Sequence, residues 1–285
     1  MILITGATGN LGSSVVHYLK NLMPLNKFVA LARNVEKAQL LIDQDITVRF
    51  GDFNDINSLE PACLGIETLV LISTMEMNRF NQHKTVVDAA KKAGVKHIIY
   101  TSLAIKDIEN SAVKELMQSH FETEEYIKQS GLDYTILRNT MYAEAIPQII
   151  GEHVLDTGIQ LAGGLGKVPY ALRDEMGEGI ANLLVQSGHK NKTYNITGSE
   201  FYSYQDIAAM LSEISGKKIN YHALENDEYI SLLEGFGLPK FLIYLTSGTV
   251  LDIKNDQYEI ESLDLEKLLG RKTTALKNYL TQIYQ

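Results

Sequence analysis

Residues 2–12 read Ile2-Leu3-Ile4-Thr5-Gly6-Ala7-Thr8-Gly9-Asn10-Leu11-Gly12, a short apolar run followed by three glycines at intervals of three. The run predicts a buried strand, and apolar residues at helical spacing from Leu11 to Leu22 predict a helix directly after it. A glycine turn between a strand and a helix is typical of a site for a dinucleotide pyrophosphate, because the helix N-terminus offers free N–H groups and the positive end of its dipole. The spacing is G-x-x-G-x-x-G, not the more familiar G-x-G-x-x-G, so an ordinary glycine turn is the alternative.

Each glycine of this loop has a separate role if the loop binds a pyrophosphate. Gly6 allows the tight turn, Gly9 lets the backbone approach the pyrophosphate, and Gly12 lets the helix pack close to the sheet. We therefore expect the loop to bind a cofactor through Gly6, Thr8, Gly9, Asn10, Leu11 and Gly12.

Strand and helix patterns alternate from this loop to about residue 139. Buried strands are predicted at 2–5, 27–32, 46–50, 68–73, 97–101 and 134–137, with helices at 11–22, 36–41, 57–63, 80–93 and 115–129. Such alternation is typical of an α/β fold with a Rossmann-type, doubly wound parallel sheet. A helix at 175–186, with Asp174 as a candidate N-cap, and a strand at 193–197 could rejoin this sheet. We expect a nucleotide-binding domain at 1–139 plus about 174–197, and a smaller, mostly helical substrate-binding lobe at about 140–173 plus 198–285.

Composition narrows the class of protein. The 285 residues carry a net charge of −9, which argues against nucleic acid as a partner because such binding depends on Lys and Arg. The apolar runs are too short to span a bilayer, and no secretory signal is recognised at the N-terminus. Cys63 is the single cysteine, and no histidine pair has the spacing of a zinc site. We therefore expect a cytoplasmic protein with no metal, no membrane partner and no nucleic-acid partner.

The residue after the second predicted strand indicates which dinucleotide is bound. NAD sites place a carboxylate there for the ribose 2′-hydroxyl, whereas NADP sites place a basic residue. Here Ala32 is followed by Arg33, with Lys37 as a second cation, and no carboxylate occurs before Glu36. A guanidinium suits a 2′-phosphate, so NADPH is the predicted cofactor, although Arg33 could also be an ordinary surface residue. Asp52 and Phe53 follow the third strand and are expected beside the adenine, with a turn or helix cap as the alternative for Asp52.

Several stretches along the whole chain resemble one protein family. The sequence is similar to the NmrA-like group of atypical short-chain dehydrogenases, and most similar to bacterial type 2 NADPH:quinone oxidoreductases and triphenylmethane dye reductases. The stretches that carry the resemblance are Ile4–Gly12, Leu31–Asn34, Tyr100–Leu103, His120–Glu124, Tyr134–Asn139, Tyr194–Gly198 and Gly270–Thr274. The resemblance implies a Rossmann domain that binds NADPH and a small C-terminal lobe that closes over a substrate cleft. It also implies that Ser73 and Thr74 lie beside the cofactor, and that Thr140, Met141 and Tyr142 lie near the nicotinamide.

The acid of ordinary short-chain dehydrogenases is missing. Those enzymes use a Tyr with a Lys four residues later, and no Tyr of this chain has that partner. Tyr134 has Arg138 at this spacing, but on a predicted strand, where the two positions are more than about 10 Å apart. The position that holds a catalytic Lys in related ether and isoflavone reductases corresponds here to His120. Hydride addition to a ketone forms a strongly basic alkoxide that needs a positioned acid. A quinone gives a weakly basic phenolate instead, so positioning and exclusion of water matter more.

These observations favour a reductase that passes hydride from NADPH directly to a planar, quinone-like acceptor. Tyr142 is expected to stack on the acceptor, and His120 could donate a proton or hold a water. The alternatives are packing for Tyr142 and a helix residue without chemistry for His120. Two other functions stay open, a dye or azo reductase with the same mechanism and a regulator that senses NADP(H) without turnover. Amphipathic helices at 81–93 and 113–129 could form a homo-oligomer, although covering the sheet is the preferred interpretation.

Overall fold

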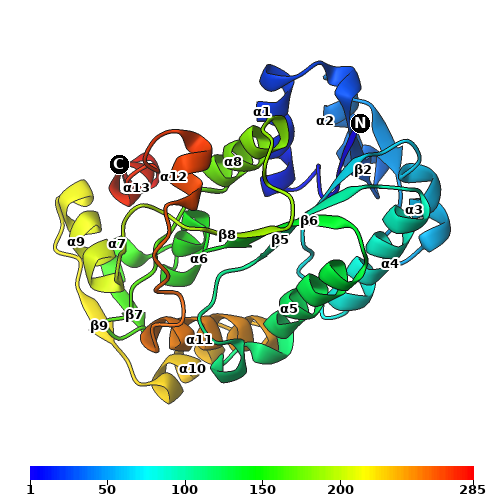
Figure 1. The fold of residues 1–285 in the computed structure, drawn as a ribbon. Coiled ribbons are helices and arrows are strands. Elements are labelled where there is room, and N and C mark those ends of the chain that lie inside the picture. The colour runs from blue at the N-terminus through cyan, green and yellow to red at the C-terminus, as the bar shows by residue number, and fades with distance from the viewer. The chain divides into compact units, whose positions relative to one another are not determined.

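The computed structural model describes residues 1–285. Its main element is a seven-stranded sheet in the order β3-β2-β1-β4-β5-β6-β8. Figure 1 labels β2, β5, β6 and β8 of this sheet. The strands are β1 (Ile2–Ile4), β2 (Phe28–Ala32), β3 (Val48–Phe50), β4 (Thr68–Leu71), β5 (His97–Leu103), β6 (Asp133–Asn139) and β8 (Lys192–Ile196). All pairings from β3 to β6 are parallel. The predicted Rossmann-type α/β fold is confirmed, and β8 extends the sheet beyond β6, as predicted for residues 193–197.

Later strands of the chain lie on both sides of β1 in the sheet. β1 pairs with β2 on one side and with β4 on the other, and ligands of open α/β sheets bind at such a switch point, outside the carboxyl ends of the strands. The helices are α1 (Asn10–Leu22), α2 (Val35–Ile42), α3 (Ile56–Ala62), α4 (Arg79–Lys92), α5 (Lys114–Gln129), α6 (Ile146–Ile150), α7 (Val154–Thr157), α8 (Arg173–Val185), α9 (Tyr204–Ser215), α10 (Asn226–Gly235), α11 (Lys240–Lys254), α12 (Asp264–Leu269) and α13 (Leu276–Tyr284). Short 3₁₀ segments are η1 (Leu25–Lys27), η2 (Ile108–Asn110) and η3 (Ala143–Ala145).

The core on one face of the sheet explains the apolar pattern of the strands. Alternate residues such as Leu3, Leu69 and Ile98 pack against Val86 and Val87 of α4, together with residues of α3 and α5. The residues between them in the strands are also buried, as expected for a parallel sheet with helices on both faces. α4 therefore covers the sheet with its apolar side (Figure 1).

Helices α1 and α8 pack together on the other face (Figure 1). A Cβ atom at Gly177 would lie 2.4 Å from the Cβ of Ser14, so glycine is required for this close approach. Asp174 accepts hydrogen bonds from the Ser14 hydroxyl (3.1 Å) and the Tyr18 hydroxyl (2.6 Å). The prediction that Asp174 is an N-cap is wrong, since α8 begins at Arg173 and the carboxylate binds α1 instead.

The chain divides into two compact units. The first comprises residues 1–103, 118–139 and 173–194, and the second comprises 104–117, 140–172 and 195–285. Compared with the division expected from the sequence, residues 104–117 pack with the second unit. One reason is the buried Asp252 carboxylate, which accepts hydrogen bonds from the Ser111 hydroxyl (2.5 Å) and the Ala112 amide (2.7 Å).

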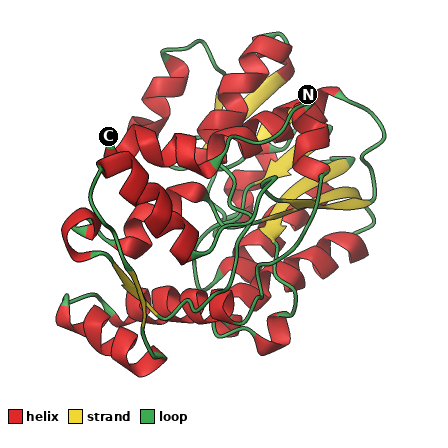
Figure 2. Ribbon diagram, turned by 90° about the vertical axis from the view of Figure 1, so that its left-hand side faces the viewer, coloured by secondary structure: helices red, strands yellow, loops and turns green.

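The second unit is mostly helical and contains a two-stranded parallel sheet. The pair is formed by β7 (Ile159–Leu161) and β9 (Tyr221–Ala223), drawn in yellow among the red helices of Figure 2. Tyr204, Tyr229 and Tyr258 are among its buried side chains. No helix in either unit combines the length and the apolar composition that a membrane span requires.

Candidate active site

The glycine loop closes tightly onto the first turn of α1. Gly6 has a φ of +61°, a backbone conformation that side chains disfavour. The Gly9 amide donates a hydrogen bond to the Gly6 carbonyl (2.9 Å), and Gly9 is the N-cap of α1. A Cβ atom at Gly12 would lie 2.1 Å from the Gly6 carbonyl oxygen. The sequence places glycine at these positions because the loop backbone and the helix backbone touch.

A cavity of about 310 Å³ opens beside this loop in the first unit. It lies at the carboxyl ends of β1 to β4, where the fold predicts a ligand. Its lining consists of Gly6, Thr8, Leu31, Ala32, Arg33, Asn34, Lys37, Gly51, Asp52, Phe53, Thr74, Glu76 and Gln82. The structure thus brings together six residues predicted to bind a cofactor, namely Gly6, Thr8, Arg33, Asp52, Phe53 and Thr74.

The cations of the cavity come from the end of β2 and the start of α2. Arg33 and Lys37 are exposed and line the same space. Asn34 caps α2 by accepting a hydrogen bond from the Lys37 amide (3.0 Å). Two cations beside a helix N-terminus form an environment that favours a phosphate group.

The position of Asp52 is compatible with a place beside the adenine and also with a turn. It lines the cavity, and its Oδ1 also accepts hydrogen bonds from the Asn54 amide and the Asn54 side chain, both 2.9 Å. Phe53 offers an aromatic surface in the same lining. An aromatic ring beside a hydrogen-bonding carboxylate can accommodate a purine.

The other residues of the glycine loop and Ser73, which were also predicted to bind the cofactor, lie outside the cavity lining. Gly9 and Asn10 begin α1, while Leu11 and Gly12 are buried under the loop. Ser73 donates its amide hydrogen to the Thr101 hydroxyl (2.9 Å) and does not line the cavity.

Sequence reasoning missed several residues of the cavity lining, among them Glu76 and Gln82. Both follow β4, and the rule that ligands gather at strand carboxyl ends could have indicated this segment. Residue spacing alone does not show that α4 turns Gln82 toward the cavity.

Asn139 was also missed. Its side chain is buried at the carboxyl end of β6, and neither the amide nitrogen nor the amide oxygen has a hydrogen-bond partner. An unpaired buried amide costs roughly 1–3 kcal/mol, and the protein itself encloses both polar atoms of this side chain. The next residues, Thr140, Met141 and Tyr142, belong to the second unit. Thr140 has an unpaired, buried hydroxyl, Met141 and Tyr142 are half-buried, and their predicted roles stay predictions.

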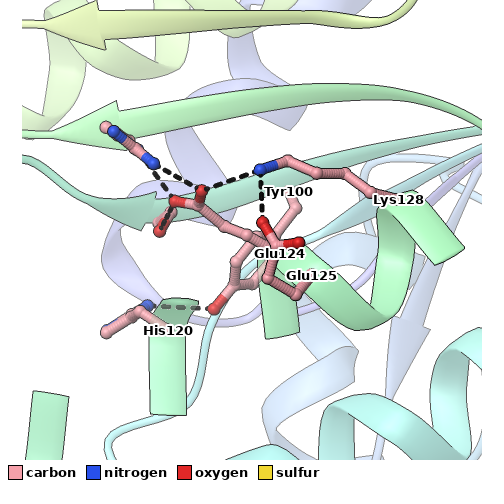
Figure 3. A network of polar contacts seen from close by, with 7 residues as sticks. Tyr100, His120, Glu124, Glu125 and Lys128 are labelled. Atoms are coloured by element: carbon pink, nitrogen blue, oxygen red, sulfur yellow. Dashed lines mark hydrogen bonds and ion pairs between the residues drawn. The ribbon is translucent and has the colours of Figure 1, made fainter. Parts of the chain in front are cut away.

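His120 is buried on α5 and touches Tyr100. Its Nδ1 lies 2.9 Å from the Tyr100 hydroxyl, and a dashed line marks this contact in Figure 3. Burial, and secondarily the Arg79 charge, hold the pKa of His120 well below its usual range, and burial raises the pKa of Tyr100. His120 has an exposed fraction of 6% and does not line the cavity beside the glycine loop. The lowered pKa keeps its imidazole neutral.

A second polar cluster lies beside this pair (Figure 3). The buried Glu124 carboxylate receives two hydrogen bonds from the Arg138 guanidinium, at 2.9 and 2.7 Å, and one from the Ser102 hydroxyl at 2.6 Å. The Ser102 hydroxyl therefore donates its hydrogen bond to another residue of the protein, Glu124. Arg138 pairs with Glu124 across α5 and β6 rather than with Tyr134.

We predict that the two buried histidines make stability fall in acid. Burial and then the Arg79 charge lower the pKa of His83 to about 3, and His120 shifts in the same direction. Below pH about 6.5 the unfolded histidines bind protons that the folded ones do not, so the unfolding free energy falls as the pH falls, by about 1.4 kcal/mol per pH unit for His83. Urea unfolding between about pH 7 and about pH 4 measures this slope. His83→Gln should reduce it, whereas replacement of the exposed His17 should leave the slope unchanged.

Comparison with known proteins identifies the family. The model of the NmrA-like family matches residues 1–283. The chain belongs to the NmrA-like family. It is 36% identical to quinone oxidoreductase 2 of Escherichia coli (strain K12), and the alignment covers 100% of this chain and 99% of that protein.

Solved structures of NmrA-like relatives agree with the sequence comparison. The NADPH-dependent quinone oxidoreductase of Escherichia coli, crystallised with NADPH, superposes with a TM-score of 0.92 at 36% identity over 100% of both chains. The triphenylmethane reductase of Citrobacter sp., complexed with NADP(H), gives a TM-score of 0.91 at 35% identity over 99% of both chains. The predicted resemblance to these two groups is confirmed.

Proposed function

We propose that this NmrA-like protein is an NADPH-dependent oxidoreductase that transfers a hydride to a planar, quinone-like acceptor. The observation that carries the proposal is the cavity of the first unit, in which Arg33 and Lys37 lie beside the glycine loop. The full-length similarity to a quinone oxidoreductase supports the same reaction class.

The residues of the cavity suit the parts of NADPH. Gly6, Thr8 and the N-terminus of α1 would bind the pyrophosphate, and Arg33 with Lys37 would bind the 2′-phosphate. Asp52 and Phe53 would hold the adenine. Thr140 and Met141, which follow Asn139 at the end of β6, would lie beside the nicotinamide. When bound, NADPH supplies the hydride for the reaction.

His120 acts in this proposal as a hydrogen-bond donor rather than as a strong acid. Tyr100 keeps its proton because burial raises the pKa of its phenol, so the phenol donates to His120 Nδ1. Nε2 would then carry the single proton of a neutral imidazole and would donate a hydrogen bond to the acceptor oxygen. Tyr142 would stack on the acceptor ring. This arrangement suits a quinone, whose reduced form is a weakly basic phenolate, and does not require the Tyr and Lys pair of ordinary short-chain dehydrogenases.

Dye reduction is a second candidate, because the relatives include a triphenylmethane reductase and, at 28% identity over 85% of this chain and 83% of that protein, an NAD(P)H azoreductase of Xenophilus azovorans. Both reactions would use the same donor and differ in the acceptor. A panel of acceptors therefore separates them.

The test follows the absorbance of NADPH with purified protein and a panel of benzoquinones, naphthoquinones, a triphenylmethane dye and an azo dye, with NADH in parallel. We expect rapid oxidation of NADPH by quinones and slower oxidation of NADH. Fast turnover with dyes alone would favour the dye reductase. Tight binding of NADPH without oxidation by any acceptor would contradict the enzyme and favour an NADP(H)-sensing regulator.

A further inference from the structure

Residues 72–74 follow β4, and side chains from three separate parts of the first unit bind their backbone amides. The Ile72 amide donates to Thr5 Oγ1 (3.0 Å), the Ser73 amide to Thr101 Oγ1 (2.9 Å) and the Thr74 amide to His83 Nε2 (3.3 Å). Backbone amides at the end of a strand have lost their ladder partners, so other groups must satisfy them when they are buried. Here each amide is held by a separate side chain.

Thr74 has the most complete set of contacts in this segment. Besides its amide, its carbonyl oxygen accepts a hydrogen bond from Arg79 Nε (2.5 Å), and its hydroxyl donates to Gln82 Oε1 (2.8 Å). All three partners lie within five consecutive residues at the start of α4. Thr74 also lines the cavity, so α4 fixes the backbone and the side chain of one residue in the cavity wall.

A chain of hydrogen bonds defines which nitrogen of His83 carries the proton. The Thr123 hydroxyl donates to the Ser119 carbonyl (2.7 Å), so its oxygen can only accept from His83 Nδ1 (3.1 Å). His83 is therefore protonated at Nδ1 and leaves Nε2 as an acceptor for the Thr74 amide. A second proton on this ring would remove that acceptor.

Arg79 contributes a fully buried guanidinium. Its Nη1 donates to the Ser119 hydroxyl (2.8 Å) and its Nη2 contacts the Met75 sulfur (3.5 Å). Burying a cation is costly, so this position is not one that packing alone would favour. Its charge opposes protonation of His83, which keeps the acceptor of the Thr74 amide in place.

We propose that Arg79 and His83 are positioning residues that hold Thr74 in the wall of the NADPH cavity before the cofactor binds, an inference that rests on the proposed function. A wall that is already ordered loses less conformational freedom on binding, and so the affinity for NADPH is higher. Neither residue lines the cavity, so both act through Thr74 and not through direct contact with the cofactor.

The first test measures NADPH binding by titration of its fluorescence in His83→Leu, in which the imidazole is replaced by an apolar side chain. We expect the Kd for NADPH to rise about tenfold, as for the loss of one hydrogen bond that orders the site, with kcat at saturating NADPH unchanged. His83→Gln should restore most of the affinity, because its carboxamide oxygen can accept from the Thr74 amide.

The matched control is His97→Leu. His97 also bonds to a threonine, with Nε2 at 2.8 Å from Thr135 Oγ1, but it begins β5 and so lies at the amino end of that strand, whereas the cavity lies at the carboxyl ends. This variant should bind NADPH like the wild type, so a general effect of imidazole loss is distinguished from loss of the Thr74 contact.

The second test measures the protonation of the wild-type imidazoles by ¹⁵N NMR and does not depend on enzyme activity. We expect His83 to show a protonated Nδ1 and an unprotonated Nε2 at neutral pH. Thr123→Val removes the acceptor of Nδ1–H and should change this tautomer and weaken NADPH binding together. An Nε2–H tautomer in the wild type, or an unchanged Kd in His83→Leu while the wild type binds NADPH, would overturn this inference alone. No binding of NADPH to the wild type would overturn the proposed function as well.

Discussion

Replacing Arg33 with serine is expected to abolish most of the preference for NADPH over NADH. Arg33 is exposed in the cavity and is the first cation after β2, where it would pair with the 2′-phosphate. Loss of a charge-assisted contact of this kind raises the Kd for NADPH by roughly 30-fold. Binding of NADH, which lacks the phosphate, should stay within about twofold. Titration of both dinucleotides into wild-type and variant protein measures how the ratio of the Kd for NADH to the Kd for NADPH changes.

Lys37→Ser is the matched control for Arg33. Lys37 lines the same cavity, but an ammonium on a flexible stem cannot form the paired contacts of a guanidinium. We expect its loss to weaken NADPH binding by less than about fivefold. If Arg33→Ser retained the wild-type ratio, the 2′-phosphate would have to be bound elsewhere.

The variant Gly12→Ala is expected to be the most damaging single change in the glycine loop. Its Cβ would lie 2.1 Å from the Gly6 carbonyl oxygen and 2.9 Å from the Ala7 Cα, and both are backbone atoms. The loop must therefore move away from α1. We expect a loss of about 2–3 kcal/mol in the unfolding free energy, typical of overpacking, and a loss of NADPH binding. Urea unfolding and NADPH titration measure the two effects.

Gly9→Ala provides the comparison for this variant. Its Cβ would lie 3.3 Å from the same carbonyl oxygen, and its φ of −94° suits any residue. We expect a change in unfolding free energy below about 1 kcal/mol, with weaker NADPH binding because the methyl group obstructs the pyrophosphate. Equal stability of Gly12→Ala and Gly9→Ala would refute the close contact of loop and helix.

The sheet could be predicted because its signals are local. The apolar runs and the glycine loop are each read within a few residues. The cavity residues Arg33, Asp52 and Phe53 were predictable for the same reason, since they directly follow strands.

Contacts between residues distant in sequence could not be predicted. Asp174 binds Ser14 and Tyr18, which are 160 and 156 positions away. A cap is the simplest local interpretation of an aspartate before a helix, but the packing of α8 on α1 offers it two hydroxyl groups instead. The same holds for residues 104–117, whose place in the second unit depends on Asp252. Asn139 is similar, because its lack of partners is a property of its surroundings and not of its neighbours in the chain.

The order of the strands also bears on how the chain acquires its fold during synthesis. β6 contributes seven residues next to β8, but β8 is formed by residues 192–196, more than fifty positions later. Until those residues have left the ribosome, one side of β6 has unpaired backbone groups, and an open edge of this kind promotes association between chains. A fragment ending near residue 139 would keep that edge permanently. The nucleotide-binding part of this protein therefore cannot be cut out as a continuous N-terminal piece.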